Sequence, residues 1–251
     1  MGETAKILCP DKKVLIPDFN AGCSLADSCP ADKFAEFVKQ HPDHTVISYV
    51  NTSAAVKAVT DVVVTSTNAK QIVESFPADQ PMIFGPDKNL GNYINSVTGR
   101  NMLLWDGACH VHEKFSVEKI IELKKQYPDA DVLVHPECKG AVAKLADKIG
   151  STAGLLKHAI NSDKKDFIVA TESGILFEMR RKCPDKNFIP APPEDSTCAC
   201  NECNFMRLNT LEKLYNTLKY EWPEVVVDEA IAKEAIKPIK RMLDISAKLG
   251  L

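Results

Sequence analysis

The segment Thr45-Val-Ile-Ser-Tyr-Val-Asn-Thr-Ser-Ala-Ala-Val-Lys-Ala-Val-Thr-Asp-Val-Val-Val64 decides the fold. Its two ends are short β-branched runs of the kind found in strands, and the stretch between them places Val56 and Val59 at helical spacing. A strand, a short helix and another strand in immediate succession predict a parallel sheet with helices packed on it.

The same alternation continues on both sides of this segment. Residues 13–17 predict an earlier strand, and later strands are predicted at 82–84, 131–134 and 167–170. Val142, Leu145 and Ile149 predict a helix that runs up to Gly150. The tail predicts two helices, the second kinked at Pro238. The strands are short and too numerous for one tidy sheet, so we expect several small α/β units instead of one Rossmann domain.

Bulk properties exclude several classes of protein. The chain has 251 residues, a formal net charge of −3 and interspersed acidic and basic residues, so charge predicts neither nucleic-acid nor membrane binding. No apolar run reaches the roughly 20 residues of a membrane-spanning helix, and the first residues do not read as a secretory signal. We therefore expect a cytoplasmic protein. Its nine cysteines would be reduced there, which favours metal binding or catalysis over disulfides.

Polar residues gather where the predicted strands end, which is where open parallel sheets bind their ligands. Ser66, Ser151 and Thr152 could equally cap the following helices. His, Glu and Tyr are poor caps, so the motifs His135-Pro-Glu137 and Tyr49-Val-Asn51 favour a function. The strand-end residues are Asp18, Asn20, Tyr49, Asn51, Ser66, His110, His112, His135, Glu137, Ser151, Thr152, Thr171 and Glu172.

Three cysteines follow strands in the same way. Cys23, Cys109 and Cys203 are separated by 86 and 94 residues, which suggests one thiol for each structural unit. Three converging thiolates would suit an iron–sulfur cluster with one iron lacking a protein ligand. The alternative is that these cysteines are small buried apolar residues.

The segment 198–203 is rich in cysteine, and two local interpretations of it also remain open. Cys198, Cys200 and Cys203 could form a structural zinc site with His110 and His112. Cys200 and Cys203 could form a dithiol, although thioredoxin-type pairs open a helix directly after a first strand.

The chain resembles the quinolinate synthase family across its whole length. Each motif is weak alone, but together, in the family's order, they are specific. The motifs are Glu3-Thr-Ala-Lys-Ile-Leu8, Pro17-Asp-Phe-Asn-Ala-Gly-Cys23-Ser-Leu-Ala-Asp27, Tyr49-Val-Asn51-Thr52, Trp105-Asp-Gly-Ala-Cys109-His-Val-His112-Glu113, His135-Pro-Glu137-Cys138, Gly150-Ser-Thr152, Thr171-Glu172 and Cys203-Asn-Phe-Met206.

The resemblance implies an α/β fold of three small αβα units around a pseudo-threefold axis. The first unit would be truncated to 1–28, followed by units 29–112 and 113–203, with a helical segment 204–251 packing back on the first unit. The implied enzyme is a transferase of NAD biosynthesis. It condenses iminosuccinate with dihydroxyacetone phosphate to give quinolinate, phosphate and water. L-Aspartate oxidase is the implied supplier of iminosuccinate, and no nucleic-acid or membrane partner is implied.

The resemblance also assigns roles to residues. Cys23, Cys109 and Cys203 would hold a 4Fe–4S cluster whose open iron acts as a Lewis acid. Tyr49 and Glu137 would be catalytic. The implied substrate-binding residues are Tyr49, Asn51, Ser66, His135, Glu137, Ser151 and Thr152.

The sequence departs from the family in two places. The family's His-Tyr-Tyr-Gln strand end and Gly-Asp-Ser loop, which contact substrate, do not appear, so the chain resembles a synthase lacking half of its first unit. Lost substrate contacts predict weak or no activity for this polypeptide alone. The second departure is the Cys-x-Cys-x-x-Cys spacing, which leaves Cys198 and Cys200 without a predicted role. The alternative functions are an inactive fragment of the synthase and a non-catalytic zinc-stabilised α/β protein.

Overall fold

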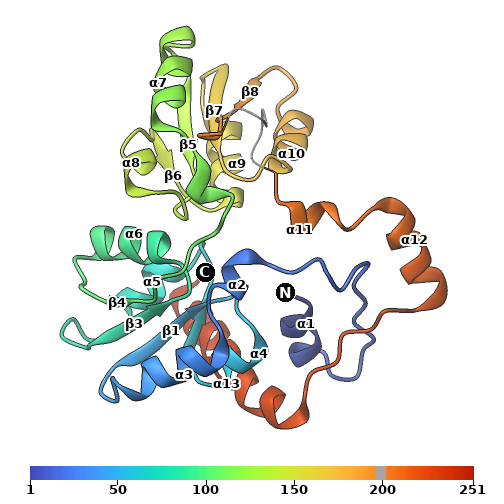
Figure 1. The fold of residues 1–251 in the computed structure, drawn as a ribbon. Helices are drawn as coiled ribbons and strands as arrows, with labels where there is room; N and C mark the ends of the chain where they lie inside the picture. The colour runs from blue at the N-terminus through green and yellow to red at the C-terminus, as the bar shows by residue number, and fades with distance from the viewer. Residues whose placement is uncertain (196–201) are drawn as a thin grey trace. The chain divides into compact units, whose positions relative to one another are not determined.

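A computed structural model describes residues 1–195 and 202–251 and shows an α/β fold with two separate sheets (Figure 1). The chain divides into two compact units. One comprises Met1–Gly107 together with Asn204–Leu251, and the other is the continuous segment Ala108–Cys203. Among the described residues, no helix is long and apolar enough to cross a membrane. The α/β class predicted from the sequence is confirmed.

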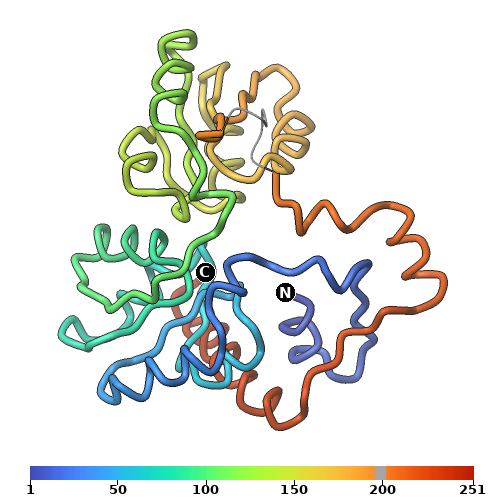
Figure 2. Tube along the Cα trace, in the orientation of Figure 1, coloured from blue at the N-terminus to red at the C-terminus, as the bar shows by residue number. Residues whose placement is uncertain are grey.

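The first unit contains a four-stranded parallel sheet of order β2-β1-β3-β4. Helix α13 packs against β2 and α4, so the end of the chain completes the core of its beginning, as the trace in Figure 2 shows. The elements are α1 (Gly2–Leu8), α2 (Ser24–Asp27), α3 (Ala31–Lys39), β1 (Thr45–Tyr49), α4 (Ala54–Lys57), β2 (Val62–Val64), α5 (Ala69–Glu74), β3 (Met82–Gly85), α6 (Lys88–Thr98), β4 (Leu103–Leu104), α11 (Asn204–Arg207), α12 (Leu211–Tyr220) and α13 (Glu229–Leu249).

The second unit repeats this topology with the order β6-β5-β7-β8, again all parallel. Its elements are η1 (His112–Lys114), α7 (Val117–Gln126), β5 (Asp131–Val134), α8 (Gly140–Ala143), β6 (Lys148–Ile149), α9 (Thr152–Asn161), β7 (Asp166–Ala170), α10 (Ile175–Lys182) and β8 (Asn187–Pro190).

Apolar strand residues alternate between two cores, because successive side chains of a strand point to opposite faces. In β5, Val132 and Val134 pack with Ile120 of α7 and Val142 of α8. Leu133 packs on the other face in the core that also contains residues of α9 and α10. Both faces are covered, which is why these strands read as continuous apolar runs.

Local signals set where the helices begin. Ser116 accepts a hydrogen bond from the amide of Lys119 and caps α7. Asp87 caps α6 by accepting from the amide of Leu90 at 2.8 Å. Helix α6 ends at Gly99, whose φ of 70° lies in the left-handed region.

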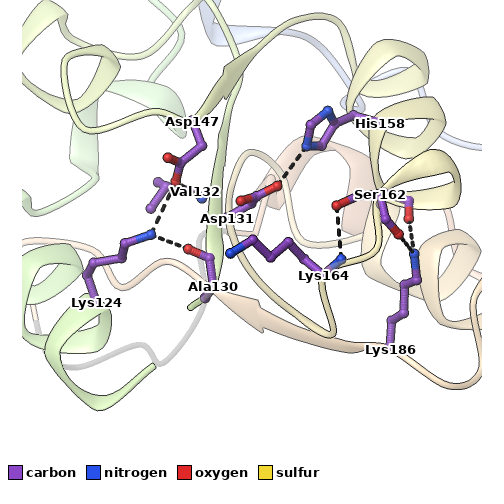
Figure 3. Close-up of polar contacts among 10 residues, drawn as sticks. Lys124, Ala130, Asp131, Val132, Asp147, His158, Ser162, Lys164 and Lys186 are labelled. Carbon is purple, nitrogen blue, oxygen red and sulfur yellow. Dashed lines mark hydrogen bonds and ion pairs between the residues drawn. The ribbon is translucent and has the colours of Figure 1, made fainter. Parts of the chain in front are cut away.

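Two aspartates have the same role in the two sheets. Asp61, just before β2, accepts a hydrogen bond from the amide of Val46 at 2.7 Å and donates its own amide to the Val46 carbonyl at 2.9 Å. Asp147, just before β6, makes the same pair of bonds with Val132 at 2.8 and 2.9 Å. Figure 3 shows Asp147 beside Val132, with Lys124 3.3 Å from its carboxylate.

Two predictions about local structure were wrong. The helix predicted through Ile149 ends at Ala143, and Lys148–Ile149 is strand β6. The bonds of Asp147 draw this segment onto β5, where strand pairing replaces the helix. Residues 13–17 form no strand; Leu15 makes only an isolated antiparallel bridge with Glu224.

Candidate functional site

A buried polar cluster lies at the carboxyl edge of the second sheet. His135 and Glu137 follow β5, Thr171 follows the neighbouring strand β7, and His112 belongs to η1. Nδ1 of His112 lies 3.1 Å from Oε2 of Glu137, and Nε2 of His112 lies 3.1 Å from the hydroxyl of Thr171. The fraction exposed is 7% for His112 and 4% for Glu137, so these polar groups depend on one another instead of on water.

The two histidine rings of this cluster stack with their centroids 4.7 Å apart. Burial, and to a smaller extent the charge of His112, lower the pKa of His135 to about 4, although the carboxylate of Glu137 opposes them. The amide of Glu137 donates to Nδ1 of His135 at 3.4 Å, which assigns the proton of this neutral ring to Nε2. His135 is therefore a neutral hydrogen-bond donor at physiological pH.

His112 behaves in the opposite way. Burial alone would lower the pKa of His112, but the neighbouring Cys109 and the carboxylate of Glu137 raise it to about 10. In this state the imidazolium of His112 and the carboxylate of Glu137 face each other as opposite charges. The 3.1 Å contact between Nδ1 of His112 and Oε2 of Glu137 is an ion pair. It does not have the geometry of a hydrogen bond, and Nδ1 has no hydrogen-bond partner among the described residues.

Cys109 completes a group of possible metal ligands in this unit. One ligand atom from each of Cys109, His112 and Glu137 lies within 4.8 Å of the others. Cys109 is half-buried, in the loop between β4 and η1.

The first sheet places the predicted residues Tyr49, Asn51 and Ser66 at its own carboxyl edge. Tyr49 ends β1 and pairs in register with Val64, the last residue of β2, and Ser66 follows in the turn. Asn51 lies in the loop after Tyr49 and is half-buried.

The buried ammonium group of Lys57 fixes this loop. Its Nζ donates to the carbonyl of Val50 at 2.9 Å, and to the carbonyl and hydroxyl of Thr52 at 2.6 and 3.1 Å. Lys57 therefore holds the residues on either side of Asn51, namely Val50 and Thr52, in place.

Ser151 and Thr152 lie where β6 leads into α9. Ser151 accepts a hydrogen bond from the amide of Gly154 at 3.2 Å and caps the helix, which is the structural role that the sequence left open. A hydroxyl that accepts one bond still has its own hydrogen to donate. Thr152 is the first residue of α9 and is exposed.

The cysteines fall into two groups by burial. Cys29, Cys138 and Cys183 are buried in apolar cores. Burial raises the pKa of the Cys29 thiol to about 12, so this thiol stays protonated at neutral pH.

The thiols predicted to bind the cluster, those of Cys23, Cys109 and Cys203, are only partly buried, as is Cys9. This exposure and the thiol chemistry fit a thiolate-bound cluster. Cys23 belongs to the first unit, whereas Cys109 and Cys203 belong to the second. Cys198 and Cys200 lie outside the described residues. The zinc-site and dithiol interpretations, which involve these two cysteines, therefore stay predictions.

Sequence reasoning noted His112 and Thr171 as polar strand-end residues. It gave Thr171 no role, and it gave His112 only a possible role in a zinc site with the cysteines of segment 198–203. The structure brings His112 and Thr171 together with His135 and Glu137. The available signal was position: His112 follows Cys109 by three residues, and Thr171 directly follows a strand.

This fold and site are those of an α/β protein with its polar groups at the carboxyl edges of parallel sheets. Comparison with known families then gives a specific match. A model of the family described as "Quinolinate synthetase A protein" matches residues 1–244. The chain belongs to the quinolinate synthase family.

Close relatives agree with the family match. The chain is 58% identical to the quinolinate synthase of Thermosynechococcus vestitus over 246 residues, covering 98% of this chain and 77% of the relative. It is 56% identical to those of Nostoc punctiforme and Chloroherpeton thalassium, covering 98% of this chain and 76% of each relative.

Proposed function

We propose that this chain is a transferase of NAD biosynthesis that condenses iminosuccinate with dihydroxyacetone phosphate to form quinolinate, releasing phosphate and water. The observation that carries the proposal is the buried pair of His112 and Glu137 beside Cys109, at the carboxyl edge of a parallel sheet. Family membership supports the product of this reaction, because the relatives are named quinolinate synthases.

We assign Cys23, Cys109 and Cys203 as the ligands of a 4Fe–4S cluster. When bound, a cluster with one iron free of protein ligands supplies a Lewis acid that polarises a substrate oxygen without redox change. Support comes from the partial exposure of all three thiols.

Glu137 is the general base in this proposal. Tautomerisation and ring closure each require a proton to leave carbon or nitrogen, and a carboxylate oxygen of Glu137 accepts it. The imidazolium of His112, 3.1 Å away, keeps this carboxylate ionised and oriented. Burial removes competing water, which strengthens both effects.

Neutral donors bind the anionic substrates. His135 donates from Nε2 to a substrate carboxylate, and Ser151 and Thr152 donate their hydroxyl hydrogens to carboxylate or phosphate oxygens. On the first sheet, Asn51 and Ser66 are the corresponding donors, and Tyr49 is a candidate acid or base.

The chemical lability of iminosuccinate favours an enzyme such as L-aspartate oxidase as its direct supplier. The arrangement of three units around a pseudo-threefold axis, with parts 1–28, 29–112, 113–203 and 204–251, remains part of the proposal.

Iron content after anaerobic reconstitution tests the proposal. We expect a brown protein with about four irons per chain. Cys23→Ala and Cys109→Ala should each abolish the cluster, whereas Cys9→Ala, at another partly exposed thiol, should keep it. A colourless protein after reconstitution would overturn the assignment.

Two further measurements separate the alternatives. The zinc-stabilised alternative predicts zinc in the purified protein, unfolding by chelators, and a metal content unchanged by Cys23→Ala or Cys109→Ala. Quinolinate formation by the reconstituted chain then separates an active synthase from the alternative of an inactive protein.

A further inference from the structure

The group formed by Cys109, His112 and Glu137 has features of a metal site that are independent of the other cysteines. All three residues lie in the second unit, and their ligand atoms lie within 4.8 Å of one another. A thiolate, an imidazole and a carboxylate are the three ligand types that Zn²⁺ takes in proteins. Mg²⁺ and Ca²⁺ require oxygen ligands and are disfavoured by such a set.

One buried nitrogen atom points to a missing ligand. Nδ1 of His112 is buried and has no hydrogen-bond partner among the described residues, although the Glu137 carboxylate lies 3.1 Å away. A buried ring nitrogen without a hydrogen bond is destabilising unless something else binds it. Coordination of a metal ion would satisfy this nitrogen.

The other side of the same ring is held as in a metal-ligating histidine. Nε2 of His112 lies 3.1 Å from the hydroxyl of Thr171. Histidines that bind metals almost always donate their second N–H to an oxygen, which fixes the ring and its tautomer. Thr171 therefore directs Nδ1 toward Cys109 and Glu137.

We propose that Cys109, His112 and Glu137 bind one Zn²⁺ ion when the iron–sulfur cluster is absent, with a fourth coordination position left for water. The Cys109 thiol and Nδ1 of His112 release their protons to solvent as the metal binds. The zinc site does not depend on the proposed function. Only its predicted effect on cluster assembly rests on that function. Because Cys109 cannot serve both metals, Zn²⁺ should block cluster assembly.

Metal titration of the reduced, metal-free protein under anaerobic conditions tests the site. Co²⁺ is the probe, because its visible absorption reports tetrahedral coordination and its near-ultraviolet charge-transfer band reports a bound thiolate. We expect one Co²⁺ per chain, displaced by one Zn²⁺. Cys109→Ser should remove the thiolate band, and Glu137→Gln should weaken binding. Thr171→Val should weaken binding by about 10- to 100-fold.

Cysteine variants elsewhere separate the zinc site from the cluster. Cys23→Ala and Cys203→Ala should abolish the iron cluster but keep the Co²⁺ band, so failure of one assignment does not imply failure of the other. Zinc loaded before reconstitution should reduce iron uptake by the unmodified protein.

Three outcomes would overturn the proposal, provided that circular dichroism shows each variant to be folded. One is a Co²⁺ band that survives Cys109→Ser. Another is a band lost equally in Cys23→Ala, which would place the metal among the three cluster cysteines. The last is a band lost when Cys198 and Cys200 are both changed to alanine.

Discussion

His112 and His135 stack 4.7 Å apart, yet their pKa values move in opposite directions. Both rings are buried, and burial disfavours the charged form of each. His112 gains a proton because Glu137 and Cys109 face it, and its charge then helps to keep His135 neutral. One cation and one neutral donor thus lie side by side at the sheet edge, which suits a site for carboxylate-bearing substrates.

Glu137→Gln should reduce kcat by roughly 10²- to 10⁴-fold, because an amide cannot accept the proton that the carboxylate takes. The same change removes the negative charge beside His112, so the pKa of His112 should fall. Steady-state kinetics measures the first effect, and NMR titration of the histidines in the cluster-free protein measures the second. Glu122→Gln, at an exposed position in the same unit, is the control and should change neither. An unchanged kcat in Glu137→Gln would remove Glu137 from the mechanism.

Ser151→Ala separates the capping role of this residue from substrate binding. Ser151 and Ser116 cap helices in the same unit, so Ser116→Ala is a matched control. Each change should lower the free energy of unfolding by about 1 kcal/mol, measured by urea denaturation. Only Ser151→Ala should also raise KM, because only Ser151 is assigned to bind substrate. Equal stability losses with unchanged KM in both variants would leave Ser151 as a cap alone.

Lys57 should make stability depend on pH in the alkaline range. Burial lowers the pKa of Lys57 from 10.5 to about 8, and the nearby charge of Glu3 opposes this shift. Between these values the unfolded chain holds more protons than the folded one, so this group makes the free energy of unfolding rise with pH across that window. Below about pH 8 both states are protonated, and the full cost of the buried charge is present.

The difference in unfolding free energy between the unmodified protein and Lys57→Met isolates this effect. It should shift in favour of the unmodified protein by up to roughly 3 kcal/mol between pH 8 and pH 10.5. Lys39→Met, at an exposed lysine, should show no such shift. A pH-independent difference for Lys57→Met would mean that the folded protein keeps this ammonium charged.

Asp61→Ala and Asp147→Ala should have similar effects, because the two carboxylates accept from equivalent strand amides at 2.7 and 2.8 Å. Each substitution leaves one strand amide, that of Val46 or Val132, without its carboxylate acceptor and should lower the free energy of unfolding by about 1 to 3 kcal/mol in urea denaturation. Asp129→Ala, in an exposed turn, should change it by less than about 0.5 kcal/mol. If only one of the two variants lost unfolding free energy, the carboxylate-to-amide bond would not have the same role in the two sheets.

Patterns within a few residues predicted most of the strands, because buried parallel strands are continuous apolar runs. The short strand β6 was missed because it depends on Asp147 binding Val132, fifteen residues earlier in the chain. Residues 13–17 carry a strand-like pattern, yet Leu15 finds only one bridge partner, in a segment near the other end of the chain.

The candidate site could be predicted only in part, for the same reason. Motifs identified His135 and Glu137, but the contact between His112 and Thr171 joins residues 59 positions apart. No local pattern encodes such a contact. The convergence of Cys23 with Cys109 and Cys203 remains a prediction, since Cys23 lies in a different unit.

The path of the chain through the two units has a consequence for synthesis on the ribosome. The second unit is the continuous segment Ala108–Cys203, so all of its strands have emerged before α13 is translated. The first unit needs Ala235 and Ile239 of α13 to cover Val63 of β2. Domains fold as units once their residues are available. The first unit is therefore completed only after the second unit has been made, and its sheet lacks part of its apolar cover until α13 emerges.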